Sequence, residues 1–196
     1  MTFQQYRCLV RSDLFRLAGE HPVFFRFLRL VLFRPGTQYL FLLRTTRYLA
    51  GKPLLFPVFI MLRLILMHLS YYYGISLPYT TRIGPGFYIG HFGGIVVNDQ
   101  VILGKNCNLS QNVTLGIANR GKRPGCPVIG DEVYIGPGAV IFGHVTIGNR
   151  AAIGANCVVT RDVPENGVVV GVPGTVISLN GSEGYVDHTW ERDCQH

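Results

Sequence analysis

The sequence predicts two structural parts that meet near residue 76: a helical N-terminal region and a β-solenoid built from six-residue repeats. Residues 1–75 contain few glycines and show apolar residues in helical runs, whereas from Leu77 an aliphatic residue recurs every six positions. The 24 glycines fit a solenoid, which uses them at its corners. At 196 residues the chain has room for one ordinary domain and a smaller appendage, which excludes two large domains.

The helical region predicts about four helices. The last apolar run, from Leu54, is long enough to suggest a membrane span, but Pro57 and Arg63 interrupt it. From Val58 to Tyr73 it would reach roughly 24 Å, against about 30 Å for the hydrocarbon core of a bilayer. We therefore expect that it does not span a membrane. The expected breaks between helices are Pro22, the Pro35-Gly36 pair, Pro53 and Gly74.

The excess positive charge of the chain lies entirely in the helical region. Residues 1–76 carry ten Lys or Arg against Asp13 and Glu20, whereas residues 77–196 carry eight basic and nine acidic residues. The basic residues alternate with Leu, Phe, Val and Ile rather than with polar or stacking residues, which argues against nucleic acid as a partner. Two alternatives stay open: these helices contact an anionic membrane surface, or they pack against another subunit.

The cysteines predict a reduced compartment. The five cysteines are odd in number and form no CxxC pattern or Cys/His cluster, so we expect neither a disulfide framework nor a zinc site. The first 20 residues contain no apolar segment of the secretory type. We expect a cytoplasmic protein, or one held at the inner face of the plasma membrane.

The repeats predict short parallel strands with the aliphatic residues inside and the glycines at the corners. Four extra residues between Val113 and Ile129 interrupt the register and predict one protruding loop, residues 117–128. We expect a solenoid domain over residues 76–178 and a polar, acidic tail over 179–196 to which the sequence assigns no role. The aligned positions are Leu77, Ile83, Ile89, Ile95, Val101, Cys107, Val113, Ile129, Ile135, Ile141, Ile147, Ile153 and Val159.

The repeats and three segments resemble the hexapeptide-repeat acyltransferases. The segments are GFYIGHFGGIVV, LSQNVTLG and AAIGANCVVTRDVPENGVVVGVPG. The nearest branch is that of the serine acetyltransferase-like enzymes, which includes polysaccharide-biosynthesis O-acetyltransferases. The resemblance covers residues 75–175 and implies a left-handed parallel β-helix, a homotrimer and acetyl-CoA bound between neighbouring subunits. A dimer of trimers through the N-terminal helices stays open.

The resemblance also implies a catalytic residue. Acetyl transfer to a hydroxyl needs a base near pH 7, and a neutral histidine is suited to that task. His91 matches the catalytic histidine of the family, with Gly90 and Phe92 beside it as acceptor-site residues. His144 occupies the fourth place of an ordinary hexad, where we expect it to face outward without a catalytic role.

The remaining site residues are predicted by family position. The basic loop is expected to complete the acceptor site through Lys122, Arg123 and Cys126. Backbone amides and small side chains suit the pantetheine arm of acetyl-CoA, and no metal is expected, because the repeats hold no set of three histidines. The residues expected to bind acetyl-CoA are Gly116, Pro137, Gly138, Ala155, Asn156 and Arg161.

The predicted acceptor depends on what the site lacks. Serine acetyltransferases carry two aspartates and an Arg-His pair near the acceptor, and the matching positions here are Ser76, Gly90 and the Gly125-Cys126 pair. A free amino acid carries an ammonium and a carboxylate, each of which favours a charged partner. We therefore expect O-acetylation of a saccharide hydroxyl in capsule, exopolysaccharide or glycolipid biosynthesis. The alternatives are serine O-acetylation in cysteine biosynthesis and a non-catalytic solenoid platform.

Overall fold

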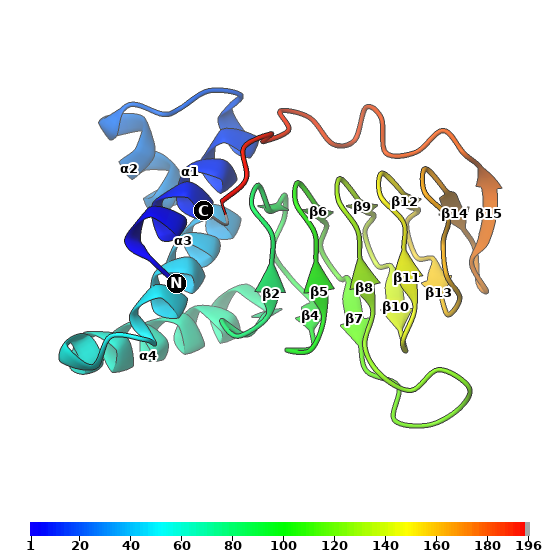
Figure 1. The fold of residues 1–196 in the computed structure, drawn as a ribbon, viewed down its shortest axis with the longest axis horizontal. Helices are drawn as coiled ribbons and strands as arrows, with labels where there is room; N and C mark the ends of the chain where they lie inside the picture. The colour runs from blue at the N-terminus through cyan, green and yellow to red at the C-terminus, as the bar shows by residue number, and fades with distance from the viewer. Residues whose placement is uncertain (195–196) are drawn as a thin grey trace.

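A cap of helices packs against one end of an elongated parallel β-helix in the computed structural model, which describes residues 1–194 (Figure 1). The C-terminal segment leaves the far end of the β-helix and runs back along it to the cap, so that the two ends of the chain lie close together (Figure 1). Residues 195–196 of the predicted tail lie outside the described part of the chain.

The helices begin and end at residues whose local chemistry explains the boundary. Thr2 caps α1, because its side chain accepts from the Gln5 N–H while the Gln5 side chain accepts from the Thr2 N–H. Gly19 and Gly74 end α1 and α4 with φ values of 70° and 62°. Pro35 is the first residue of α3 rather than part of a linker. The helices are α1 (Phe3–Ala18), α2 (Phe24–Phe33), α3 (Pro35–Leu49), the short 3-10 helix η1 (Pro53–Leu55) and α4 (Phe56–Tyr73).

The apolar stretch formed by η1 and α4 is joined to the rest of the molecule. By length and composition alone, this stretch could cross a membrane. Phe59 and Leu66 are its buried residues, and Leu66 belongs to the same core as the solenoid aliphatics. Tyr39 of α3 also forms a hydrogen bond of 3.0 Å with Ser70 of α4. That this helix does not span a membrane stays a prediction.

The solenoid strands form three sheets around one core. From β1 to β13 successive strands join successive sheets. Paired residues such as Val140 and Val158 are 18 positions apart, which corresponds to three hexads per coil, whereas Ile83 and Leu103 in the first coil are 20 apart. Within the sheets all pairings are parallel except that of β14 with β15. The first sheet contains β1 (Ile75–Ser76), β4 (Ile95–Val97), β7 (Thr114–Gly116), β10 (Val140–Phe142) and β13 (Val158–Val159); the second contains β2 (Arg82–Ile83), β5 (Ile102–Leu103), β8 (Val128–Ile129) and β11 (Thr146–Ile147); the third contains β3 (Tyr88–Ile89), β6 (Asn108–Leu109), β9 (Tyr134–Ile135), β12 (Ala152–Ile153), β14 (Val168–Val170) and β15 (Thr175–Ser178).

The residue that leads each predicted hexad faces the core. All thirteen positions are buried, and the most exposed of them, Ile83, is only 7% exposed. These side chains belong to one continuous core along the solenoid, together with strand residues such as Leu103 and Leu109. The six-residue period therefore predicted which residues are buried, but its register is two residues off in the first coil, where Ile83 pairs with Leu103 and Ile89 with Leu109. The leading residues that lie just outside the strands are Leu77, Val101, Cys107 and Val113.

A buried ion pair joins the helical cap to the first coil. Arg44 of α3 is 1% exposed, and its Nε donates to Asp13 Oδ2 of α1 at 2.9 Å. The same guanidinium donates to the carbonyl oxygens of Ile83 and Gly84 at 2.8 and 2.7 Å. Asp13 in turn accepts from the Phe87 N–H at 2.9 Å. Since buried charges are costly without partners, these contacts fix how α1, α3 and the first coil meet.

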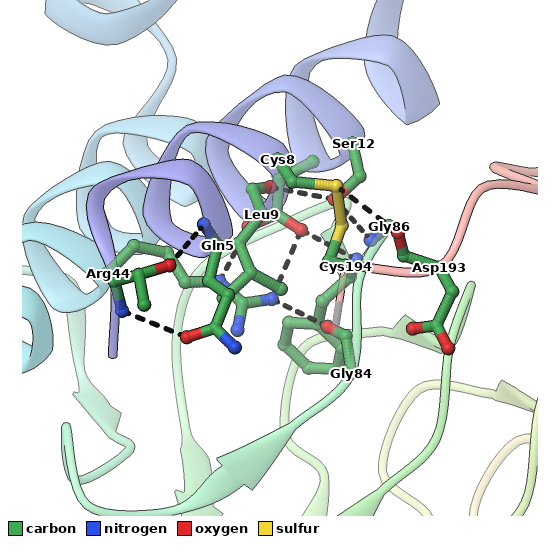
Figure 2. Close-up of a disulfide and its surroundings, with 12 residues drawn as sticks. Gln5, Cys8, Leu9, Ser12, Arg44, Gly84, Gly86, Asp193 and Cys194 are labelled. Atoms are coloured by element: carbon green, nitrogen blue, oxygen red, sulfur yellow. Dashed lines mark hydrogen bonds and ion pairs between the residues drawn. A yellow bond between two sulfur atoms is a disulfide. The ribbon is translucent and has the colours of Figure 1, made fainter. Parts of the chain in front are cut away.

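A disulfide between Cys8 of α1 and Cys194 corrects the expectation that the cysteines are reduced (Figure 2). The two residues are 186 positions apart in the sequence, whereas cysteine spacing detects only pairs and clusters that are close along the chain. Cys107, Cys126 and Cys157 are free and buried. The disulfide shows that two of the five cysteines are oxidised. The cytoplasmic location stays a prediction.

The segment before Cys194 is bound along the corner between the second and third sheets. The Ser182 N–H donates to the Arg150 carbonyl at 2.9 Å, and Asn108 Nδ2 donates to the Tyr185 carbonyl at 2.6 Å. Asn106 forms two hydrogen bonds with the Trp190 backbone, of 2.9 and 3.1 Å. The tail is therefore an ordered strap that connects successive coils to the cap.

Candidate active site

The predicted site residues lie at two different corners of the β-helix. The His91 corner, between the third and first sheets, consists of the stacked turns 90–94, 110–113, 136–139 and 154–157. The loop corner, between the first and second sheets, includes the protruding loop. The first sheet separates the two corners. One chain therefore does not bring its own His91 and its own loop together.

His91 is exposed in the turn between β3 and β4. The end of α4 holds this turn: the Ile95 N–H donates to the Gly74 carbonyl at 3.0 Å, and the Phe92 ring lies 5.5 Å from that of Tyr73. No group within residues 1–194 hydrogen-bonds the His91 imidazole. The described residues also contain no group of three or more His, Cys, Asp or Glu arranged to hold a metal ion. An orienting partner for His91 is thus not supplied by the described part of its own chain.

The residues predicted to bind acetyl-CoA at this corner form a ladder with the His91 turn. Pro137 and Gly138 belong to one turn of the corner, and Ala155 and Asn156 belong to the next. Because each turn stacks on its neighbour, these four residues follow His91 along a single edge of the β-helix. The backbone hydrogen bonds between turns run from Asn112 to Gly93 at 2.8 Å, from Gly138 to Gln111 at 3.0 Å and from Asn156 to Pro137 at 2.8 Å.

This ladder uses two of the backbone donors that the sequence assigned to pantetheine. The N–H groups of Gly138 and Asn156 donate to the neighbouring turn, so neither is available to a ligand. The Ala155 N–H has no acceptor among residues 1–194, and Ala155 is exposed. An exposed amide donor beside small side chains fits the amide-rich pantetheine arm. That acetyl-CoA binds at this corner stays a prediction, and Ala155 is the predicted residue there whose N–H is not used within the described residues.

The other predicted residues lie at the loop corner. Gly116 ends β7, Arg161 follows β13, and the loop carries Lys122, Arg123 and Cys126. An antiparallel bridge between Ala118 and Gly125 closes the base of the loop.

Within the loop, two of the predicted acceptor residues have structural partners. Arg123 forms an ion pair of 2.6 Å with Asp162, whose hydrogen bond raises the pKa of Arg123 and lowers the pKa of Asp162. Cys126 is only 7% exposed, its Sγ lies 3.3 Å from Asn98 Oδ1, and burial raises the pKa of its thiol. Both residues anchor the loop to the coil. Lys122 is exposed and forms no ion pair within the described residues.

A groove that the sequence did not predict runs between α4 and the first sheet. Its volume is about 600 Å³, and Tyr71, Ser76 and Val96 are among the residues that line it. Ser76, which matches an aspartate of the serine acetyltransferases, lines this groove and forms no hydrogen bond with His91. Sequence patterns gave no signal for the groove, because its walls come from a helix and a sheet with different periods.

Comparison with known proteins identifies the family. Residues 126–161 match the model of the bacterial transferase hexapeptide family, which describes six repeats. A serine acetyltransferase of Bacillus pumilus is 30% identical over 175 residues, which cover 89% of this chain and 79% of that protein. The chain belongs to the serine acetyltransferase family. A Synechococcus elongatus member is 36% identical over 155 residues, although the match covers only 62% of that longer protein.

Solved structures agree with this assignment. The serine acetyltransferase of Neisseria gonorrhoeae in complex with serine is 30% identical, with a TM-score of 0.72 over 90% of this chain and 70% of that one. Serine acetyltransferase isoform 3 of Entamoeba histolytica in complex with cysteine has a TM-score of 0.64 at 30% identity. The predicted fold class is confirmed: the solenoid is a left-handed β-helix of hexapeptide repeats.

Family membership confirms one functional prediction and corrects another. As a serine acetyltransferase-family protein, the chain is an acyltransferase that uses acetyl-CoA, so the non-catalytic platform is excluded. The prediction of a saccharide acceptor in polysaccharide biosynthesis is wrong, because the curated relatives are serine acetyltransferases and one solved relative holds serine. The prediction relied on missing charged residues at three positions. It gave no weight to other groups that could take over their role.

Proposed function

We propose that the protein transfers the acetyl group of acetyl-CoA to the hydroxyl of L-serine, as in cysteine biosynthesis. The observation that carries this proposal is the similarity to serine acetyltransferases, which extends over most of the chain and includes the segment around His91. The geometry supports it, since His91 and the Ala155 amide lie along the same edge of the β-helix. Such an edge would hold the acetyl donor beside the base.

In the proposed mechanism, His91 acts as the general base. Its neutral imidazole takes the proton of the serine hydroxyl as the oxygen attacks the acetyl carbonyl. The tetrahedral intermediate collapses, the bond from carbon to sulfur breaks, and the proton passes from the imidazolium to the CoA sulfur. Exposure of His91 in a turn flanked by Gly90 and Gly93 leaves space for both substrates.

The complete site requires a second subunit. The first sheet separates His91 from the loop of its own chain, so the loop would reach a histidine only on a neighbouring molecule. A homotrimer whose threefold axis runs parallel to the solenoids would place the loop corner of one chain beside the His91 corner of the next. The missing partner of the His91 imidazole would then come from the neighbouring chain.

Serine must be bound by groups other than the aspartates and the Arg-His pair that this chain lacks. Lys122 and Arg120 are the exposed cations of the loop without an ion pair among the described residues, and Lys122, the predicted acceptor residue, would bind the serine carboxylate. Arg123 would act indirectly, because its ion pair with Asp162 fixes the loop from which Lys122 projects.

Thiol release from acetyl-CoA in the presence of L-serine tests the function. We expect serine to accelerate release, and His91→Ala to reduce the rate by about 100-fold or more, as loss of a general base does. His144→Ala is the matched control, since His144 is the other histidine of the repeats and is also exposed. It should retain the wild-type rate.

Two results would contradict the proposal. Unchanged activity of His91→Ala would remove His91 from the mechanism. Normal binding of acetyl-CoA without any response to L-serine would show that serine is not the acceptor.

A further inference from the structure

Helix α2 lies on the outer side of the helical cap, away from the strands (Figure 1). It packs mainly on α3, where Phe27 meets Phe41 edge to face with ring centroids 5.8 Å apart. None of its ten residues is buried. A helix of this length reaches only about 15 Å and cannot cross a bilayer.

One side of α2 is an exposed apolar stripe. The stripe consists of Phe24, Phe25, Leu28 and Leu32, which are 68%, 82%, 37% and 57% exposed. Their spacing places them on adjacent positions of the helix surface, beside the side that packs on α3. Large apolar residues gathered in this way mark an interaction surface, whereas single exposed ones are ordinary.

Beside the stripe lies an arginine hollow of about 300 Å³. Arg26, Arg29 and Arg34 line it together with Leu30 and Phe33. Arg26 is paired with Glu20, whereas Arg29 and Arg34 form no ion pair within residues 1–194. Guanidinium groups bind phosphate in a bidentate manner, so three of them around an apolar floor suit a phospholipid headgroup and its acyl chain.

We propose that α2 binds in the plane of an anionic phospholipid membrane, with the apolar stripe among the acyl chains and the arginine hollow on lipid phosphates. The charge distribution selects this occupant over a second copy of the chain. Pairing two copies through α2 would bring six arginines together, in a region whose net charge is already +8 over residues 1–76. An anionic bilayer neutralises that charge and buries the stripe. This inference is independent of the acceptor proposed above.

Flotation of the full-length protein with vesicles tests the proposal. Vesicles of phosphatidylcholine and phosphatidylglycerol at a 7:3 ratio should carry the protein at 50 mM NaCl, whereas pure phosphatidylcholine should carry much less. Salt at 500 mM should weaken binding, because it screens the charges. Arg29→Gln with Arg34→Gln should lower the partition coefficient by about 25-fold, at about fivefold for each arginine.

Matched control variants separate this surface from general charge and hydrophobicity. Arg82→Gln with Lys105→Gln removes the same charge from β2 and from the turn after β5, and this variant should bind like the wild type. Phe25→Ser with Leu32→Ser should abolish flotation, whereas Ile177→Ser with Leu179→Ser, at the far end of the solenoid, should not. Circular dichroism checks folding, and the single variant Phe25→Ser is used if the double variant unfolds.

Acetyl transfer without vesicles should be the same in the α2 variants and the wild type. The proposal is overturned if anionic vesicles carry no more protein than neutral ones, or if the α2 and control variants bind alike. A fall in oligomer mass on substitution of the stripe, without vesicle binding by the wild type, would identify a second copy as the occupant.

Discussion

At the residue scale, the corners of the β-helix depend on side chains and glycines that fit together across coils. Gly86 has a φ of 71°, and a Cβ at that position would collide with the Asn106 side-chain oxygen. Asn106 itself has a φ of 57°, which asparagine tolerates better than most residues. Its amide holds the Trp190 backbone at both the N–H and the carbonyl. One glycine therefore leaves room for the side chain that binds the tail.

Gly86→Ala should destabilise the protein more than Gly184→Ala does. Both glycines have similar positive φ values, 71° and 79°, but a Cβ at Gly184 would meet no atom within 4 Å. The backbone cost of about 1 kcal/mol is shared, whereas crowding adds about 1–3 kcal/mol at Gly86 alone. Thermal unfolding of the two variants measures the difference. Equal melting temperatures would show that Asn106 can move away without cost.

At the element scale, the Asp13–Arg44 ion pair decides how the helical cap sits on the first coil. The pair is buried, and both partners also hydrogen-bond backbone groups of residues 83–87. Its net contribution to stability is modest, because burying two charges offsets much of their attraction. Removing one partner is different, since it leaves the other charge buried alone.

Asp13→Asn should therefore cost about 3–5 kcal/mol of unfolding free energy. Replacing both residues by apolar ones, as in Asp13→Leu with Arg44→Met, should cost less than the single change. Denaturant unfolding of the two variants and the wild type checks this order. A double variant less stable than Asp13→Asn would mean that the hydrogen bonds to the first coil, rather than the charge balance, hold the cap.

At the scale of the whole molecule, the strap and the disulfide connect the two ends of the chain. The bond between Cys8 and Cys194 encloses nearly the entire fold, and the strap contacts several coils on its way to α1. Such a crosslink restricts the unfolded chain far more than the folded one. It also holds the strap against Asn106 and Asn108.

Reduction should lower the stability of the wild type by about 2–4 kcal/mol. The variant Cys8→Ser with Cys194→Ser should show the lower stability already and should not respond to reductant. Thiol titration of the denatured, unreduced wild type should detect the three free cysteines only. Five titratable thiols would show that the bridge does not form in solution.

Sequence periodicity predicted the fold well because the solenoid is repetitive and local. Each hexad places its own aliphatic residue inside, so a position such as Ile135 needs no distant information to be assigned to the core. The four extra residues after Val113 similarly predicted the loop. The acceptor was harder to predict, because the groups that select it come from several elements. The absence of charged side chains at Gly90 and Cys126 does not exclude that other residues take their place.

The sequence by itself determined the helical region, the six-residue coils and the loop, since each follows from spacing, and the family resemblance pointed to His91 as the candidate base. Only the tertiary structure decided that Cys8 meets Cys194, that Arg123 is held by Asp162, and that His91 and the loop lie at different corners. The physical reason is that short-range periodicity fixes which face of a strand is buried. Contacts between residues far apart in the chain depend on how complete elements stack, and no local pattern records that arrangement.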